Sequence, residues 1–133
     1  MTDAAPRHQQ RERALSLLYE AELKDEGPLQ VVDDLAVPPD PYVRTLVERA
    51  VATREEADRR IAAASVAWPL ERMAVIDRIV LRLAVGELLD PDGPPVAVVI
   101  DEAVELVKEY STDESGGFVN GILSTIAAEV KPG

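Results

Sequence analysis

The 133-residue chain contains no cysteine and only one histidine. Without cysteine there is no disulfide framework and no thiolate metal site, which fits a reducing compartment. The single histidine, His8, has no second imidazole with which to form a metal site. We therefore expect neither a metal nor a cofactor.

Long apolar runs are also absent. The longest strictly aliphatic run extends from Val96 to Ile100, which is far too short to span a bilayer. The polar N-terminus lacks the apolar core of a signal peptide. These absences predict a cytoplasmic protein with no membrane partner.

Catalytic signatures are missing as well. The sequence has no glycine-rich phosphate loop with a lysine, no HExxH motif and no histidine placed with a serine and an acid. Acidic pairs such as Asp101-Glu102 and Asp113-Glu114 carry the groups for acid/base or Mg²⁺ chemistry. On polar helix faces such pairs are usually just solvated, so we expect that the protein is not an enzyme.

Basic residues are scarce relative to acidic ones. Fourteen Lys and Arg stand against 25 Asp and Glu, and the net charge is −11. RNA-binding proteins owe much of their affinity to neutralising phosphates, and an acidic surface repels the RNA backbone. Such a chain should bind RNA weakly alone, unless a basic partner supplies charge or binding is confined to a local cationic patch.

The chain does contain helical periodicity along its length. Apolar residues recur at helical spacing in five stretches, at 14–21, 43–51, 75–88, 99–110 and 119–130. No alternating strand pattern with a hairpin signal accompanies them. We predict an all-α fold of about seven helices.

Glycine and proline indicate the boundaries. Gly27 should end the first helix, and Pro28 and Pro41 should each begin another. Trp68 precedes a proline, so it should separate two halves and pack at the seam between them. The predicted organisation is a disordered tail at 1–7, an N-terminal helical subdomain at 8–67 and a C-terminal helical subdomain at 68–133.

The most distinctive stretch covers residues 95–126. It predicts a helix, a polar loop and a second helix that begins near Ser115. Gly116 and Gly117 occupy its first turn, where ordinary helix formers would be better by about 1 kcal/mol each, and Phe118 follows. Either the open N–H groups and the ring hold an anion, or a flexible loop enters the helix with Phe118 as a core anchor.

Three blocks of the sequence carry a family resemblance. They are RERALSLLY at 11–19, AVIDRIVLR at 74–82 with GEL at 86–88, and IDEAVELVKEYSTDESGGFVNGIL at 100–123. In this order they resemble the NusB family of bacterial transcription antitermination factors, in its actinobacterial form. The resemblance implies two packed three-helix subdomains. It also implies binding of a BoxA-type RNA element in nascent ribosomal RNA together with the ribosomal protein NusE, so that RNA polymerase reads through terminators.

The same resemblance implies roles for individual residues. An RNA-binding set would comprise Arg7, Gln10, Arg11, Arg82, Glu114 and Phe118, with the ring of Phe118 stacked on a base. A partner-binding set would comprise Tyr19, Leu23 and Asp77. Arg78 and Arg82 lie one turn apart, and from sequence they form either an anion site or one half of surface ion pairs.

The chain departs from the family pattern at two places, and both remove positive charge. Glutamines stand among the N-terminal arginines, and Gly117 occupies a commonly basic position. We therefore expect weak binding to RNA alone and a heavy dependence on NusE. The competing hypothesis is an acidic helical adaptor or homodimer that binds no RNA and whose arginines pair with its own carboxylates.

Overall fold

The computed structural model describes residues 6–132, which form seven α-helices and one 3-10 helix without any strand. The elements are α1 (Arg7–Lys24), α2 (Pro28–Asp33), α3 (Pro41–Ala52), α4 (Arg54–Ala64), η1 (Leu70–Arg72), α5 (Val75–Leu89), α6 (Val96–Tyr110) and α7 (Ser115–Val130). The predicted all-α fold is confirmed. Of the expected tail, residues 1–5 lie outside the described residues, and Arg7 already begins α1.

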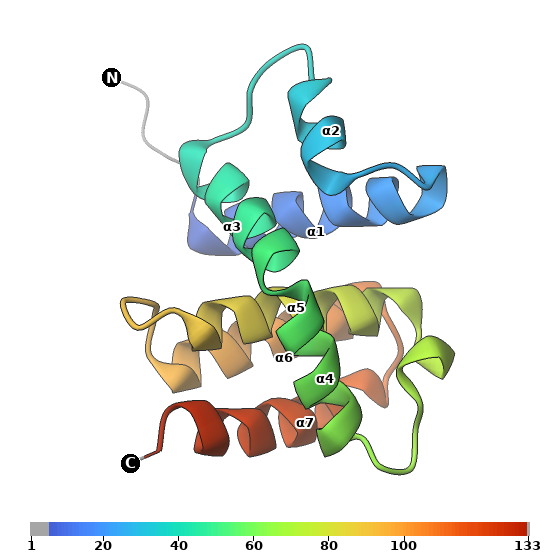
Figure 1. The fold of residues 1–133 in the computed structure, drawn as a ribbon, viewed down its shortest axis with the longest axis vertical. Helices are drawn as coiled ribbons and strands as arrows, with labels where there is room; N and C mark the ends of the chain where they lie inside the picture. Colours follow the sequence, from blue (N-terminus) through green and yellow to red (C-terminus); the bar gives the residue numbers. More distant parts are fainter. Residues whose placement is uncertain (1–5, 133) are drawn as a thin grey trace.

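The helices form two stacked groups, with α1, α2 and α3 above α4, α5, α6 and α7 in Figure 1. α5 is the central element, since it packs against α1, α3, α4, α6 and α7. α4 follows α3 after a break at Thr53, and it lies against α5 and α7. The predicted division of the chain between residues 67 and 68 stays a prediction. α4 precedes this position in the chain, but it packs on α5 and α7, which follow it.

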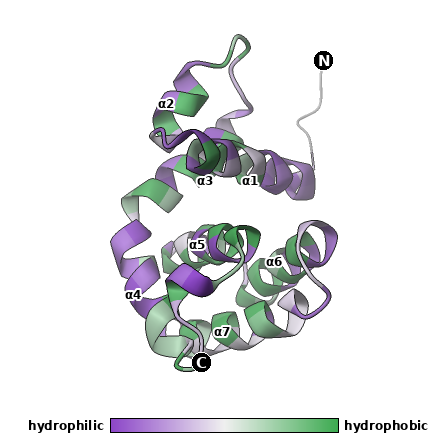
Figure 2. Cartoon of the chain, turned by 90° about the vertical axis from the view of Figure 1, so that its right-hand side faces the viewer, coloured by the Kyte–Doolittle hydropathy of each residue, from purple (hydrophilic) through white to green (hydrophobic). Residues whose placement is uncertain are grey.

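Hydropathy explains why α4 covers the core from outside. Figure 2 shows a largely hydrophilic α4 beside the more hydrophobic α5 and α7. Only Ala57 and Ile61 of α4 are buried. α5, in contrast, is buried continuously from Ile79 to Leu88. Among the described residues, no helix has the length and apolar character needed to cross a membrane.

The first helix ends differently from the prediction. α1 stops at Lys24, and Asp25 adopts the left-handed conformation with φ 53°. Aspartate tolerates this conformation better than most residues, so the turn does not need Gly27, whose φ is −65°. The prolines were predicted correctly: Pro28 and Pro41 begin α2 and α3.

Trp68 does not pack at the seam, so that prediction is wrong. Its side chain is 51% exposed in the segment between α4 and η1. The indole Nε1 donates a hydrogen bond to the carbonyl oxygen of Arg72 at 3.1 Å. The N–H group is therefore satisfied within its own loop, and aliphatic residues of α5 fill the space between the two groups of helices.

Candidate nucleic-acid interface

The first turn of α1 presents an exposed cation. The guanidinium carbon of Arg7 lies 3.6 Å from the ring centroid of Tyr42, a cation–π contact. Arg7 Nη1 also donates to Gln10 Oε1 at 2.7 Å, and Gln10 Nε2 donates to Asp40 Oδ2 at 3.3 Å. Gln10 is buried. Gln10 therefore orients the guanidinium of Arg7, while its own side chain is hardly accessible to solvent.

Arg11, one turn further, faces inward. Its Nε and Nη2 donate to Glu87 Oε1 and Oε2, both at 2.9 Å, and the two residues are 6% and 2% exposed. Burial disfavours the charged guanidinium, but the hydrogen bonds to Glu87 prevail and raise the pKa of Arg11. Burial also raises the pKa of the neighbouring Tyr42. Arg11 thus joins α1 to α5, and its guanidinium is not offered to solvent.

Arg82 on α5 also pairs with carboxylates, near the C-terminal end of α1. Its Nε and Nη2 donate to Asp58 on α4 at 2.7 and 3.1 Å, and Nη1 lies 3.4 Å from Glu22 on α1. Arg78 contacts the same Glu22 at 3.7 Å. Both arginines are therefore halves of ion pairs. Glu22 belongs to the C-terminal part of α1, so the structure does not bring Arg82 together with Arg7.

The loop between α6 and α7 is anchored on α5. Ser115 Oγ donates to Asp77 Oδ2 at 2.9 Å, and Asp77 is 6% exposed. Within the described part of the chain, Asp77 Oδ1 is buried without a hydrogen-bond partner. The backbone N–H of Thr112 donates to Ser115 Oγ at 3.3 Å. Asp77 is thus an internal support for this loop and is not a surface residue.

A lysine of α6 lies against the start of α7, which the sequence did not reveal. A Cβ atom at Gly116 would lie 3.0 Å from Lys108 Cε, so the lysine of α6 extends across the first turn of α7. Gly117 faces open space, Glu114 is exposed, and Phe118 is half-buried against the core. Lys108 was only one of several polar residues in the α6 pattern, and no sequence signal connects it with Gly116.

The two regions lie on neighbouring elements. The hydroxyl of Tyr110, at the end of α6, donates to Glu12 on α1. This hydrogen bond raises the pKa of Tyr110 to about 12, so the phenol keeps its proton at neutral pH. Among residues 6–132, Arg7 and Lys108 have no ion pair with a carboxylate. Their charges remain available to an external anion.

An exposed apolar strip on α1 lies away from these cations. Tyr19 is 36% and Leu23 is 69% exposed. On the same part of the helix, a hollow of about 210 Å³ is lined by residues of α1, α3 and α5, among them Leu18, Val51 and Ile79. This strip places two of the three predicted partner-binding residues at the surface, whereas Asp77 lies inside.

Comparison with known proteins gives consistent matches over nearly the whole chain. The model of the NusB family matches residues 8–128. The transcription antitermination protein NusB of Kineococcus radiotolerans is 42% identical, covering 92% of this chain and 93% of its own. The structure of NusB from T. maritima is similar with a TM-score of 0.86 and 36% identity, covering 96% of this chain and 94% of its own.

A further similar structure is a complex. It contains the antitermination factors NusB and NusE with double-stranded RNA, and its matching chain is 32% identical with a TM-score of 0.77. The match covers 92% of the present chain and 96% of that chain.

Proposed function

Because the chain belongs to the NusB family of transcription antitermination proteins, a non-enzymatic family, we propose that it binds a BoxA-type RNA element together with NusE. The observation that carries this proposal is the likeness to a chain in the complex of NusB and NusE with RNA. The pair would act in the cytoplasm, within the complex that lets RNA polymerase read through terminators in ribosomal RNA operons.

The RNA face would consist of Arg7, Lys108, Glu114 and Phe118. Arg7 and Lys108 would contact phosphates, since neither has a carboxylate partner among the described residues. Phe118 is half-buried, which leaves part of its ring free to stack on an unpaired base. Glu114 follows the loop at the surface and would accept hydrogen bonds from base or sugar groups.

The remaining predicted RNA-binding residues would act by positioning. Gln10 hydrogen-bonds Arg7, and Arg11 holds α1 on α5 through Glu87. Arg82 ties α4 and α1 to α5. Each of the three is buried, so we assign them to maintaining the RNA face instead of contacting the RNA.

The partner face would be the strip of Tyr19 and Leu23 with the adjoining hollow. Exposed aromatic and aliphatic side chains beside a hollow are suitable anchors for a protein interface. The carboxylates of Glu22, Asp25 and Glu26 line the same hollow, and they would attract a basic ribosomal protein. Asp77 would support the loop at Ser115 instead of touching the partner.

Fluorescence anisotropy tests this function. A labelled BoxA-like oligonucleotide and a scrambled control are titrated at several salt concentrations, with and without NusE. We expect selective binding that NusE tightens. If NusE binds but the RNA never does, even at low salt, the chain is an acidic adaptor and the RNA face is wrong.

A further inference from the structure

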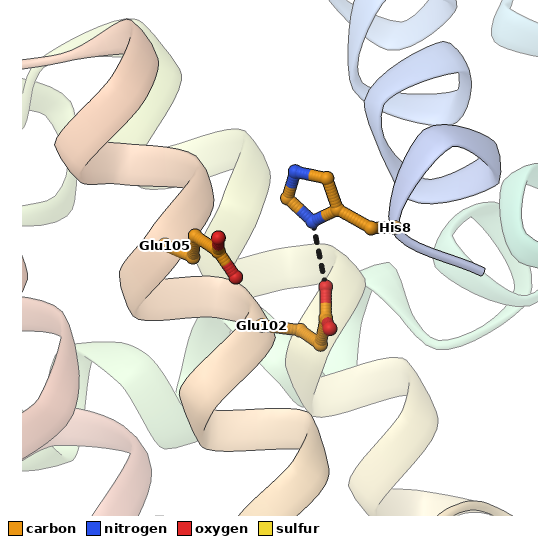
Figure 3. A group of neighbouring side chains, drawn as sticks. All are labelled: His8, Glu102 and Glu105. Atoms are coloured by element: carbon orange, nitrogen blue, oxygen red, sulfur yellow. Dashed lines mark hydrogen bonds and ion pairs between the residues drawn. The ribbon is translucent and has the colours of Figure 1, made fainter. Parts of the chain in front are cut away.

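His8 in the first turn of α1 is surrounded by carboxylates. Its Nδ1 lies 2.8 Å from Glu102 Oε2 on α6. On the other side of the ring, Nε2 lies 3.6 Å from Glu109 Oε2 and 3.9 Å from Glu12 Oε2. Figure 3 shows the imidazole projecting from α1 toward α6, where Glu102 and Glu105 point back to it. The His8 cluster comprises His8, Glu12, Glu102, Glu105 and Glu109.

The ligand atoms of this cluster are close enough for one ion. His8, Glu102 and Glu105 offer three atoms that all lie within 4.8 Å of one another, and so do His8, Glu12 and Glu109. Nitrogen and carboxylate ligands lie about 2.0–2.2 Å from a zinc ion, so in its tetrahedral geometry two ligands lie about 3.3–3.6 Å apart. The side chains would therefore draw closer together around a bound ion.

The charge of the cluster is not balanced by protein cations. Four carboxylates face one imidazole, which supplies at most one positive charge. The nearest guanidinium is that of Arg11, whose Nη1 is 4.0 Å from Glu102 Oε2, but Arg11 already forms two hydrogen bonds with Glu87. The hydrogen bond to Glu102 raises the pKa of His8, as does the charge of the surrounding glutamates. Even a protonated His8 leaves an excess of negative charge between α1 and α6, where Glu12 and Glu102 are partly buried and Glu105 and Glu109 are exposed.

We propose that His8, Glu102 and Glu105 bind a divalent transition-metal ion such as Zn²⁺ at the contact between α1 and α6. An imidazole nitrogen with carboxylate oxygens suits Zn²⁺ better than Mg²⁺ or Ca²⁺, which prefer oxygen ligands alone. Glu12 and Glu109 lie at the opposite ring nitrogen. There they would accept its N–H hydrogen bond and orient the ring, as carboxylates do around ligating histidines.

The sequence argument against a metal site considered only the number of imidazoles. The carboxylates come from α6, 94 residues away from His8 in the case of Glu102. Their spacing places Glu102 and Glu105 within one turn of α6, on the side that meets α1. A bound ion would therefore connect α1 to α6 and add positive charge next to Arg7.

The first test is calorimetric titration of ZnCl₂ into the untagged, chelator-treated chain, with NMR of the imidazole nitrogens. His8 is the only histidine, so its ¹⁵N signals are unambiguous. We expect one Zn²⁺ per chain and a metal-induced shift of one ring nitrogen. The His8→Gln variant and the Glu102→Gln/Glu105→Gln variant should each lose affinity by about tenfold or more.

Asp101→Asn is the matched control, because it removes an exposed carboxylate from the same helix without touching the cluster. It should bind Zn²⁺ like the original chain, and far-UV circular dichroism should show that all variants are folded. The proposal is overturned if the chain takes up no Zn²⁺ or if His8→Gln binds it equally well. In the first case a protonated His8 shared by the carboxylates accounts for the cluster, a result that the NMR of the unmodified chain detects directly.

Discussion

Arg11 on α1 and Glu87 on α5 form a two-point ion pair inside the molecule, with both nitrogen–oxygen distances at 2.9 Å. The residues are 76 positions apart in the chain, and solvent reaches little of either one. Glu87 belongs to the GEL block of the family resemblance, and Arg11 begins the first block. Through this pair, Arg11 holds α1, which also carries Arg7, against α5.

Replacing Glu87 by Gln should destabilise the protein strongly. The change leaves the buried guanidinium of Arg11 without its counterion, and removing one partner of a buried pair costs about 3–5 kcal/mol. The free energy of unfolding from urea denaturation measures the loss. Arg13→Ala is the control, because Arg13 is exposed and hydrogen-bonds only Ser16 among the described residues; it should change stability by less than about 0.5 kcal/mol. Similar values for both variants would contradict the assigned role of the pair.

Replacing Arg7 by Ala should weaken RNA binding without unfolding the protein. Loss of one phosphate contact reduces the slope of log affinity against log salt by about 0.7–0.9. Anisotropy titrations with the BoxA-like RNA and NusE at three or more salt concentrations provide that slope. Arg59→Ala removes another exposed arginine, located on α4, and should leave the slope unchanged. An equal effect of the two variants would mean that only net charge matters.

Replacing Phe118 by Leu should separate base stacking from packing. Leucine keeps most of the apolar contact with the core, so the free energy of unfolding should fall by less than about 1.5 kcal/mol. The aromatic face is lost, and stacking of one base contributes about 1–3 kcal/mol. RNA affinity should therefore drop by about 5-fold to 150-fold. If RNA affinity follows stability alone, Phe118 is a core anchor, the interpretation that the sequence left open.

Two helical glycines should respond differently to alanine. A Cβ at Gly121 of α7 would meet nothing within 4 Å, so Gly121→Ala should stabilise the protein by up to about 1 kcal/mol through helix propensity. A Cβ at Gly86 of α5 would lie 3.3 Å from Arg49 Cγ and from Thr53 Oγ1. Gly86→Ala should therefore lose most or all of that gain, because the side chains of Arg49 and Thr53 must shift to admit the methyl group. Paired urea denaturations provide the comparison, and an equal gain for both would refute the close approach of α3 and α5.

Local chemistry was sufficient to predict the helices. The apolar periodicity and the prolines at 28 and 41 gave the correct element types and two correct starts. The turn after α1 was mispredicted because two residues there, Asp25 and Gly27, are both suited to a left-handed turn, and it is Asp25 that adopts it.

The site residues were harder to predict because their state depends on distant partners. Arg7 and Arg11 look equivalent in the sequence, yet Arg7 lies over Tyr42 at the surface and Arg11 is inside with Glu87. Arg82 likewise finds Asp58 on a helix that its own sequence neighbourhood does not reveal. Helical spacing says which residues share a face, but not which face receives a carboxylate from another helix.

The three buried charges of α5 have a consequence for how the helices are aligned. Glu87 meets α1, Arg82 meets α4 and α1, and Asp77 meets the start of α7. Sliding α5 by a single turn shifts it by about 5.4 Å, which separates all three from their partners at once. The aliphatic residues of α5 would tolerate such a slide far better, since one apolar surface resembles another. The polar contacts therefore fix the position of α5 along its neighbours. Because α5 contacts α1 at both Arg11 and Glu22, they also fix where each end of α1 lies along α5.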